Sequence, residues 1–249
     1  MKLLRSVNGR VLIEGHRGAE GIAVENSWPA IEAGYAAGAD LLELDVQRAS
    51  DGELVIHNHY QLPDGRWMRN LDGRELRTLK PLGHPLVFLK EVLEWLGDKA
   101  IGLSLDIKNG FGFDSQVFLD TLTCVEKYDL VERVMMIGWD HAGLLLAKTR
   151  NPTIATRALI RGRPVDIVQV AQRAQADAIN LDADMVTGAE VKALHDAGIA
   201  LAIAEMIDPD FSRAARLGAD VICCRDPGAA RAALIKNGTA SHGLAGSTR

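Results

Sequence analysis

The feature that most restricts the fold of this chain is a regular alternation of two kinds of segment. Short apolar runs rich in β-branched residues alternate with longer stretches whose apolar residues recur at helical spacing. This alternation is typical of repeated βα units around a parallel sheet. One further apolar run, ELVIH at 53–57, predicts an extra strand outside the repeat. The strands predicted within the repeat are residues 11–15, 40–47, 101–107, 133–138, 153–159, 177–181, 199–204 and 220–223.

The stretches between these strands predict helices, several of which begin or end at Gly or Asp-Pro, as helix termini often do. Eight βα units with one small early hairpin fit a closed (β/α)8 barrel of the TIM type. An open doubly wound sheet is the alternative, but the sequence lacks the glycine fingerprint for dinucleotides, so we expect closure. The predicted helices are residues 27–38, 86–97, 114–128, 140–150, 164–175, 187–197, 208–217 and 228–236.

Length and polarity predict how the chain is organised around this repeat. A chain of 249 residues is long enough for one barrel, and we expect a single TIM-barrel domain over residues 1–237. The stretch 58–85 is too polar and too rich in turn residues for a core, so it predicts a long loop over one mouth of the barrel. Residues 238–249 predict a disordered tail.

Composition excludes several kinds of partner. The net charge is −5 and no basic run occurs, whereas nucleic acids and anionic membranes bind clustered positive surfaces. No apolar run is long enough to span a membrane, and the first residues, MKLLRSVNGR, lack the apolar centre of a signal peptide. We therefore expect a cytoplasmic protein without a nucleic-acid partner or integral membrane association. Its three cysteines predict neither a disulfide framework nor a zinc site, and its oligomeric state stays unknown.

Carboxylates gather near the C-terminal ends of two predicted strands. Glu43 and Asp45 lie on one face of the second strand, and Asp106 with Lys108 lies on one face of the third. Strand ends of this kind share one mouth of a barrel. Three ionised carboxylates in one pocket repel each other unless a cation compensates them, and oxygen ligands suit Mg²⁺, Ca²⁺ or Mn²⁺. The sequence therefore predicts a divalent metal site.

Histidines and cations join the carboxylates at the same mouth. His16 and Arg17 follow the first strand, and His57 ends the extra strand. Arg17 and Lys108 would make a metal-loaded site net positive, which suits an anionic substrate such as a phosphate ester. Imidazoles titrate near neutral pH, so two of them on opposite sides of a phosphorus atom can act as general base and general acid.

The residues of this expected site lie in short motifs. The motifs are HRG at 16–18, ENS at 25–27, GADLLELDV at 38–46, DGELVIH at 51–57 and DIK at 106–108. They resemble the motifs of the glycerophosphodiester phosphodiesterases, and with weaker matches the resemblance covers nearly the whole chain. The family usually has Glu-Asn-Thr where this chain has Glu-Asn-Ser, and Glu-x-Lys where it has Asp-Ile-Lys. The weaker matches are GWDHAGL at 138–144, DAINLD at 177–182 and GADVICCRDP at 218–227.

The resemblance implies a barrel enzyme that hydrolyses a small phosphodiester to a phosphomonoester and an alcohol with one divalent cation. It implies metal binding by Glu43, Asp45 and Asp106. It also implies that His16 serves as general base and His57 as general acid. By the same resemblance, Arg17 and Lys108 hold the phosphate. Whether water or a neighbouring substrate hydroxyl attacks first stays open.

Some residues depart from the family pattern near the expected site. Asp106 is one methylene shorter than the usual Glu, and Asn58-His59 follows His57 where an Asp is typical. Ala204-Glu205-Met206 stands where family members commonly carry Trp-Thr-Val on the seventh strand. Trp139 and Glu205 fall where the fourth and seventh strands open into the mouth, so we predict that both contact substrate. These changes favour an alcohol other than that of the common glycerophosphodiesters.

Several other readings of the same residues stay open. Asn26 or Ser27 can cap the helix at 27–38 instead of serving the site. A barrel that binds a phosphodiester without turnover is one alternative function. A phosphodiesterase for a sugar or lysolipid phosphodiester is another. A Schiff-base lyase using Lys108 is disfavoured, because flanking carboxylates keep a lysine protonated.

Overall fold

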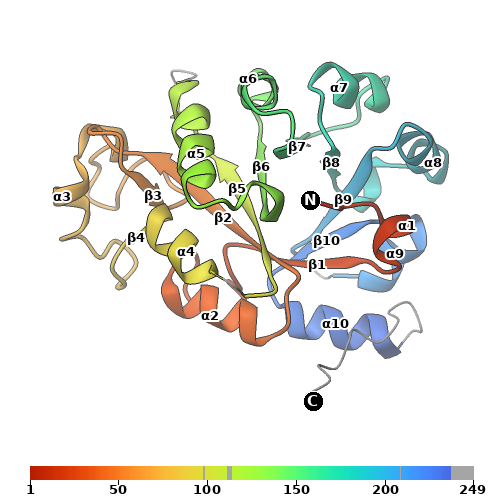
Figure 1. The fold of residues 1–249 in the computed structure, drawn as a ribbon. Helices are drawn as coiled ribbons and strands as arrows, with labels where there is room; N and C mark the ends of the chain where they lie inside the picture. Colours follow the sequence, from red (N-terminus) through yellow and green to blue (C-terminus); the bar gives the residue numbers. More distant parts are fainter. Residues whose placement is uncertain (98, 111–113, 208, 237–249) are drawn as a thin grey trace, which may run out of the picture.

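Eight parallel strands close into a barrel within the residues that this computed structural model describes, 1–97, 99–110, 114–207 and 209–236. The strands follow the order β1-β10-β9-β8-β7-β6-β5-β2, and pairing of β1 with β2 closes the ring. The predicted TIM barrel is therefore confirmed, with helices around its outside (Figure 1). The barrel strands are β1 (Leu12–Gly15), β2 (Leu41–Arg48), β5 (Gly102–Ile107), β6 (Val134–Gly138), β7 (Ala155–Leu159), β8 (Ala178–Leu181), β9 (Ala200–Glu205) and β10 (Val221–Cys224).

The helices lie between the strands nearly where the sequence predicts them. Apart from the short α1 and α3, each covers the barrel from outside, and many begin at a side chain that accepts a backbone N–H bond, as Ser27 does for α2 and Asp140 does for α6. The predicted disordered tail at 238–249 lies outside the described residues. The helices are α1 (Arg5–Asn8), α2 (Trp28–Ala36), α3 (Gly73–Leu76), α4 (Leu89–Leu96), α5 (Gln116–Lys127), α6 (His141–Arg150), α7 (Ile167–Arg173), α8 (Gly188–Asp196), α9 (Phe211–Leu217) and α10 (Pro227–Lys236).

A small antiparallel extension leaves the barrel at β2. The predicted extra strand forms β3 (Leu54–Ile56), which pairs with β2, and β4 (Val87–Phe88) pairs with β3. The prediction of a helix from residue 86 is wrong at its start. Phe88 stays extended, and its backbone N–H donates to Glu91, so the helix begins only at Leu89.

The segment 58–85 between these strands carries a core of its own. The prediction that it is too polar for a core is wrong, because Leu62, Met68, Leu71 and Leu76 are buried against the hairpin strands. A capping box between Asp72 and Glu75 starts the short α3 there. The segment lies beside β3 and β4, well to one side of the barrel axis (Figure 1).

The barrel interior changes character from bottom to top. Its N-terminal end is filled by Leu3 and by apolar residues near the starts of the strands, including several alanines. Small side chains there leave room for one long side chain above them, Arg157, which is 1% exposed. Arg157 pairs with Glu14 at 2.7 Å, and Ser104 donates a short hydrogen bond to Glu14. Above this polar layer, the C-terminal ends of the strands carry the charged residues of the mouth.

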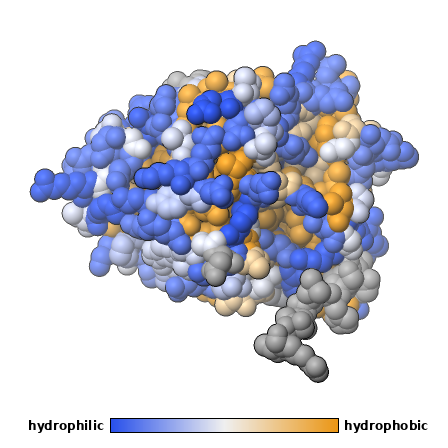
Figure 2. Space-filling model, viewed as in Figure 1, coloured by the Kyte–Doolittle hydropathy of each residue, from blue (hydrophilic) through white to orange (hydrophobic). Residues whose placement is uncertain are grey.

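Figure 2 shows one face of the molecule. Hydrophilic residues cover most of the face seen in Figure 2, with hydrophobic residues visible in patches between them. Among the residues that the structure describes, no helix has the length and the apolar character needed to cross a membrane.

Candidate active site

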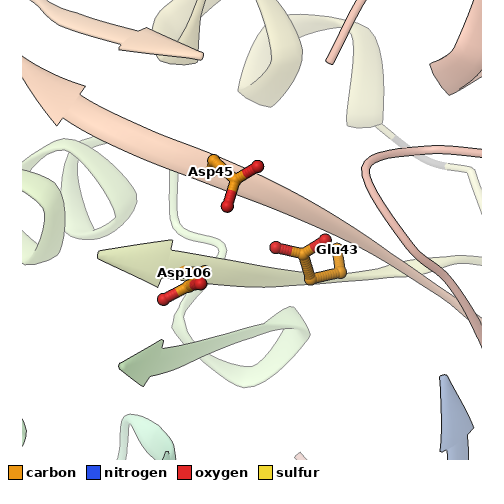
Figure 3. Close-up of side chains that lie close together, drawn as sticks. All are labelled: Glu43, Asp45 and Asp106. Atoms are coloured by element: carbon orange, nitrogen blue, oxygen red, sulfur yellow. The ribbon is translucent and has the colours of Figure 1, made fainter. Parts of the chain in front are cut away.

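Three buried carboxylates meet at the C-terminal ends of β2 and β5. In the register of these strands Asp45 lies beside Asp106, and Glu43 lies two residues before Asp45 on the same face. One oxygen from each of Glu43, Asp45 and Asp106 lies within 4.8 Å of the others. Figure 3 shows the three side chains gathered in the space between the two strands. The predicted cluster is therefore present.

The electrostatics of this cluster show how strongly the carboxylates repel one another. Burial, together with Asp45 and Asp106, raises the pKa of Glu43 to about 8. Burial and Asp45 also raise the pKa of Asp106, although Lys108 opposes them. Burial alone would raise the pKa of Asp45, but the positive charges of Lys108 and Arg17 outweigh burial and lower it. Asp106 Oδ1 is buried and has no hydrogen-bond partner among the described residues. Buried carboxylate oxygens that crowd together in this way suit a hard divalent cation.

Two cations lie against the carboxylates. Lys108 Nζ is 2.8 Å from Asp45 Oδ1 and makes a short hydrogen bond to Asp106. Arg17 Nε is 3.2 Å from Asp45 Oδ2, and its Nη1 is 2.5 Å from Glu25 Oε2. Glu25 therefore contacts a group of the site.

The loop after β1 is shaped by residues in the left-handed region. Arg17 and Asn26 have φ values of 50° and 54°. A Cβ at Gly18, where φ is 89°, would lie 2.7 Å from the backbone of Ala30, so only glycine fits there. This path lets the Arg17 backbone N–H donate to Glu43 Oε2 at 2.8 Å.

Asn26 is a site residue that sequence reasoning missed. Its Nδ2 donates to Asp45 Oδ2 at 2.7 Å, and the Asp45 backbone N–H donates to its Oδ1 at 3.2 Å. Ser27, and not Asn26, accepts the capping bond from Ala30 N at 3.4 Å. The sequence offered Asn26 and Ser27 equally as the cap of the helix at 27–38. It therefore did not show which of the two serves the site.

The two predicted catalytic histidines differ in their surroundings. His16 Nδ1 lies 2.9 Å from Glu20 Oε1, and its Nε2 lies 3.8 Å from Glu43 Oε2. Burial alone would lower the pKa of His16, but the negative charges of Glu43 and Glu20 outweigh burial and raise it. Glu20, one helical turn after His16 in the sequence, was not predicted as a site residue.

His57 is 2% exposed, and its backbone N–H donates to the Asp45 carbonyl at 2.9 Å. Its Nε2 is buried without a hydrogen-bond partner among the described residues. Burial, with His59 and Arg17, lowers the pKa of His57 to about 4. His57 does not line the main cavity, whereas His16 does.

A cavity of about 370 Å³ opens in front of the carboxylates. The structure brings most of the predicted site residues to its walls, including Trp139 on the side formed by β6, β7 and β8. That side also carries Arg161, Asn180 and Asp182, which sequence reasoning did not single out. Glu205 is the last residue of β9, but its side chain lies outside the described part of the structure. The predicted residues that line the cavity are His16, Arg17, Glu43, Asp45, Asp106, Lys108 and Trp139.

The floor of this cavity includes Arg157, a further residue that sequence reasoning missed. Its two terminal nitrogens donate to both oxygens of Glu14, at 2.7 and 3.1 Å. A buried pair of this kind adds no net charge to the cavity. Its partners are 143 residues apart in the chain, and no sequence signal connects them.

Comparison with known proteins supports one family. The model of the glycerophosphoryl diester phosphodiesterase family matches residues 16–227, which include every site residue described above except Glu14. Two curated relatives fall just below 30% identity. The uncharacterized protein YqiK of Bacillus subtilis is 29% identical over 163 residues, and the match covers 59% of this chain but only 65% of that protein, just under two thirds of its length. A glycerophosphodiester phosphodiesterase of Caldanaerobacter subterraneus is 27% identical over 179 residues, covering 67% of this chain and 74% of that one.

Solved structures with the same fold include a phosphodiesterase from Oleispira antarctica in complex with its product sn-glycerol-3-phosphate. It is 19% identical, with a TM-score of 0.81, and the match covers 92% of this chain and 99% of that one. At this identity the likeness establishes the fold.

Proposed function

Because the chain belongs to the glycerophosphoryl diester phosphodiesterase family, we propose that it hydrolyses a glycerophosphodiester or related small phosphodiester to a phosphomonoester and an alcohol. The observation that carries this proposal is the cluster of Glu43, Asp45 and Asp106 beside Lys108 and Arg17 at one cavity. The Oleispira phosphodiesterase holds sn-glycerol-3-phosphate as its product. We propose a product of the same class, a phosphomonoester, for this chain. We also propose that the protein is cytoplasmic, as expected from its sequence.

The carboxylates would hold one divalent cation, Mg²⁺ or Ca²⁺, with Mn²⁺ as the alternative. The donor set fits, since it consists of oxygens alone and includes an unpartnered Asp106 Oδ1. When bound, the ion supplies Lewis-acid stabilisation of charge on the phosphoryl oxygens. Arg17 and Lys108 would bind the remaining phosphate oxygens.

The two histidines would move the protons. In hydrolysis the oxygen of water forms a bond to phosphorus while the bond from phosphorus to the alcohol oxygen breaks. The pKa shifts favour the reverse of the roles that the resemblance implies. His57, whose pKa is lowered to about 4, is neutral near pH 7 and suits the base that takes the proton of the water. His16, whose pKa is raised, suits the acid that protonates the leaving alkoxide. A substrate hydroxyl next to the phosphate can replace the water, with the same two histidines.

One observation favours a second candidate, a barrel that binds phosphodiesters without turnover. His57 is buried and does not line the main cavity, so it reaches a substrate only after a local rearrangement. Catalytic hydrogen bonds often tighten only once substrate binds, so this placement does not outweigh the family match.

The test is release of phosphomonoester from a panel of glycerophosphodiesters, sugar phosphodiesters and lysophospholipids, with Mg²⁺, Ca²⁺, Mn²⁺ or EDTA. We expect turnover that EDTA abolishes and that His16→Ala reduces strongly. Binding of the same compounds without turnover under any metal, by a folded wild type, would replace the proposal with the binding-protein candidate.

A further inference from the structure

One side of the cavity is built from residues that follow β6, β7 and β8. Trp139 follows β6 and is 50% exposed. Arg161 follows β7, and its guanidinium carbon lies 5.4 Å from the centroid of the Trp139 ring. Asn180 lies in β8 and Asp182 follows it. All four line the cavity that holds the carboxylates, so this side faces the phosphate position from across the mouth.

The sizes of the neighbouring spaces indicate where the alcohol half of a diester fits. Lys108 also lines a second cavity, together with Tyr60, Trp67 and Arg69, which measures about 60 Å³ and is smaller than the main cavity. The main cavity, of about 370 Å³, has room for a small alcohol next to the phosphate. The side formed by β6, β7 and β8 is therefore the place for that alcohol.

On the side formed by β6, β7 and β8, one positive and one negative side chain balance each other in charge. Arg161 and Asp182 are both exposed, and neither forms a side-chain ion pair with a described residue. The floor beneath them is the Glu14–Arg157 pair, which is neutral as a unit. Among the described residues, this side therefore offers a charged alcohol no uncompensated countercharge.

The position of Arg161 also acts against one class of alcohol. A quaternary ammonium group is bound well by the open face of an aromatic ring. Here the guanidinium of Arg161 already lies over the Trp139 ring, and its like charge repels a second cation. Hydroxyl groups meet a better match, because Arg161 donates, Asp182 accepts and the Asn180 amide does both.

We propose that this side of the cavity binds an uncharged, polyhydroxylated alcohol, such as glycerol, a cyclitol or a sugar, and that Arg161 selects against quaternary ammonium alcohols. The inference rests on the proposed function and names the substrate class of the same site. The residues that carry it are Trp139, Arg161, Asn180 and Asp182.

The test compares two diesters that share glycerol and phosphate and differ in the alcohol, glycerophosphoinositol and glycerophosphocholine. We expect wild-type kcat/KM to be about 10-fold higher for the inositol diester, within the range that pocket contacts supply. Arg161→Met keeps the apolar stem and removes the charge, so it should lower kcat/KM for the inositol diester and raise it for the choline diester. Arg163→Met is the matched control, because Arg163 pairs with Glu190 and does not line the cavity.

Two results would overturn the inference: a wild-type preference for the choline diester, or an equal effect of Arg161→Met on both substrates. The proposed function fails separately, if wild type hydrolyses neither diester nor any other of the panel with any metal. In that case calorimetric binding of the two diesters still decides the inference, since equal affinities would contradict it and tighter binding of the inositol diester that Arg161→Met removes would support it.

Discussion

The two sides of the barrel mouth are organised in opposite ways. On the side of β1, β2 and β5, the charged groups are tied to one another, as Arg17 is to Asp45 and Glu25, and Lys108 is to Asp45. On the side of β6, β7 and β8, Arg161 stacks on a half-exposed Trp139 without a side-chain ion pair to any described residue. Fixed charges stabilise a transition state without reorganising, whereas loosely held groups adapt to different ligands. The comparison suggests that one side performs the common chemistry and the other selects the alcohol.

We call the side of β1, β2 and β5 the fixed side. The strongest test of the comparison removes its proposed general base, His57. His57→Ala should lower kcat by about 10²–10⁴-fold, the usual contribution of a general acid or base. His59→Ala is the matched control, because His59 lies beside His57 but is exposed, and we expect it to keep kcat within about 3-fold. Steady-state rates with a glycerophosphodiester measure both variants. Similar losses in the two would remove His57 from the chemistry.

The buried Glu14–Arg157 pair lies beneath both sides of the mouth. Removing one of its partners should lower the stability of the fold. Glu14→Gln leaves the Arg157 charge buried without its counterion, and we expect the free energy of unfolding to fall by about 3–5 kcal/mol. The double variant Glu14→Leu with Arg157→Met removes both charges and should lose much less. Urea denaturation measures the two. A single variant as stable as wild type would show that the pair is not a structural unit.

The metal cluster offers a third test, confined to the fixed side. Asp45→Asn removes a carboxylate that accepts from Asn26 and faces Glu43 and Asp106, so affinity for Ca²⁺ or Mg²⁺ should fall by about 100-fold. Asp182→Asn is the control, because Asp182 lines the same cavity outside the cluster. Calorimetric titration of the metal alone compares them. Equal losses in both variants would place the ion elsewhere in the cavity.

The fixed side was also the predictable one. Alternation along a strand placed Glu43 and Asp45 on one face, and closure of the barrel brought Asp106 beside them, so two general rules were enough. The predicted strand ends placed His16, Arg17 and His57 near the same mouth, and the family motifs implied their roles, which stay predictions.

Partners chosen by the tertiary structure were not predictable. Glu14 and Arg157 meet across the barrel, where small alanines below leave the room, and neither residue signals the other in the sequence. The buried residues of the segment 58–85, such as Leu62 and Met68, are scattered among polar residues without a regular period. Their core exists only because β3 and β4 provide a surface to pack on.

The smallest expected effect concerns pH and the stability that a metal confers. Burial with Asp45 and Asp106 raises the folded-state pKa of Glu43 to about 8, above its value in an unfolded chain. A carboxyl with a raised folded pKa contributes stability below the unfolded pKa, and this contribution is lost as pH rises through the folded pKa. Without metal, the contribution of Glu43 to stability should therefore decline between about pH 5 and pH 8.

Metal binding needs the ionised carboxylate, so below pH 8 it must displace a proton from Glu43. At a fixed concentration of Mg²⁺ or Ca²⁺, the increase in Tm should be larger at pH 8 than at pH 6, by about 5 °C. Thermal unfolding with metal and with EDTA at the two pH values measures this difference. Glu43→Gln removes the titrating group and should flatten the pH dependence, and a wild-type increment that is equal at both pH values would mean that Glu43 is already ionised without the ion.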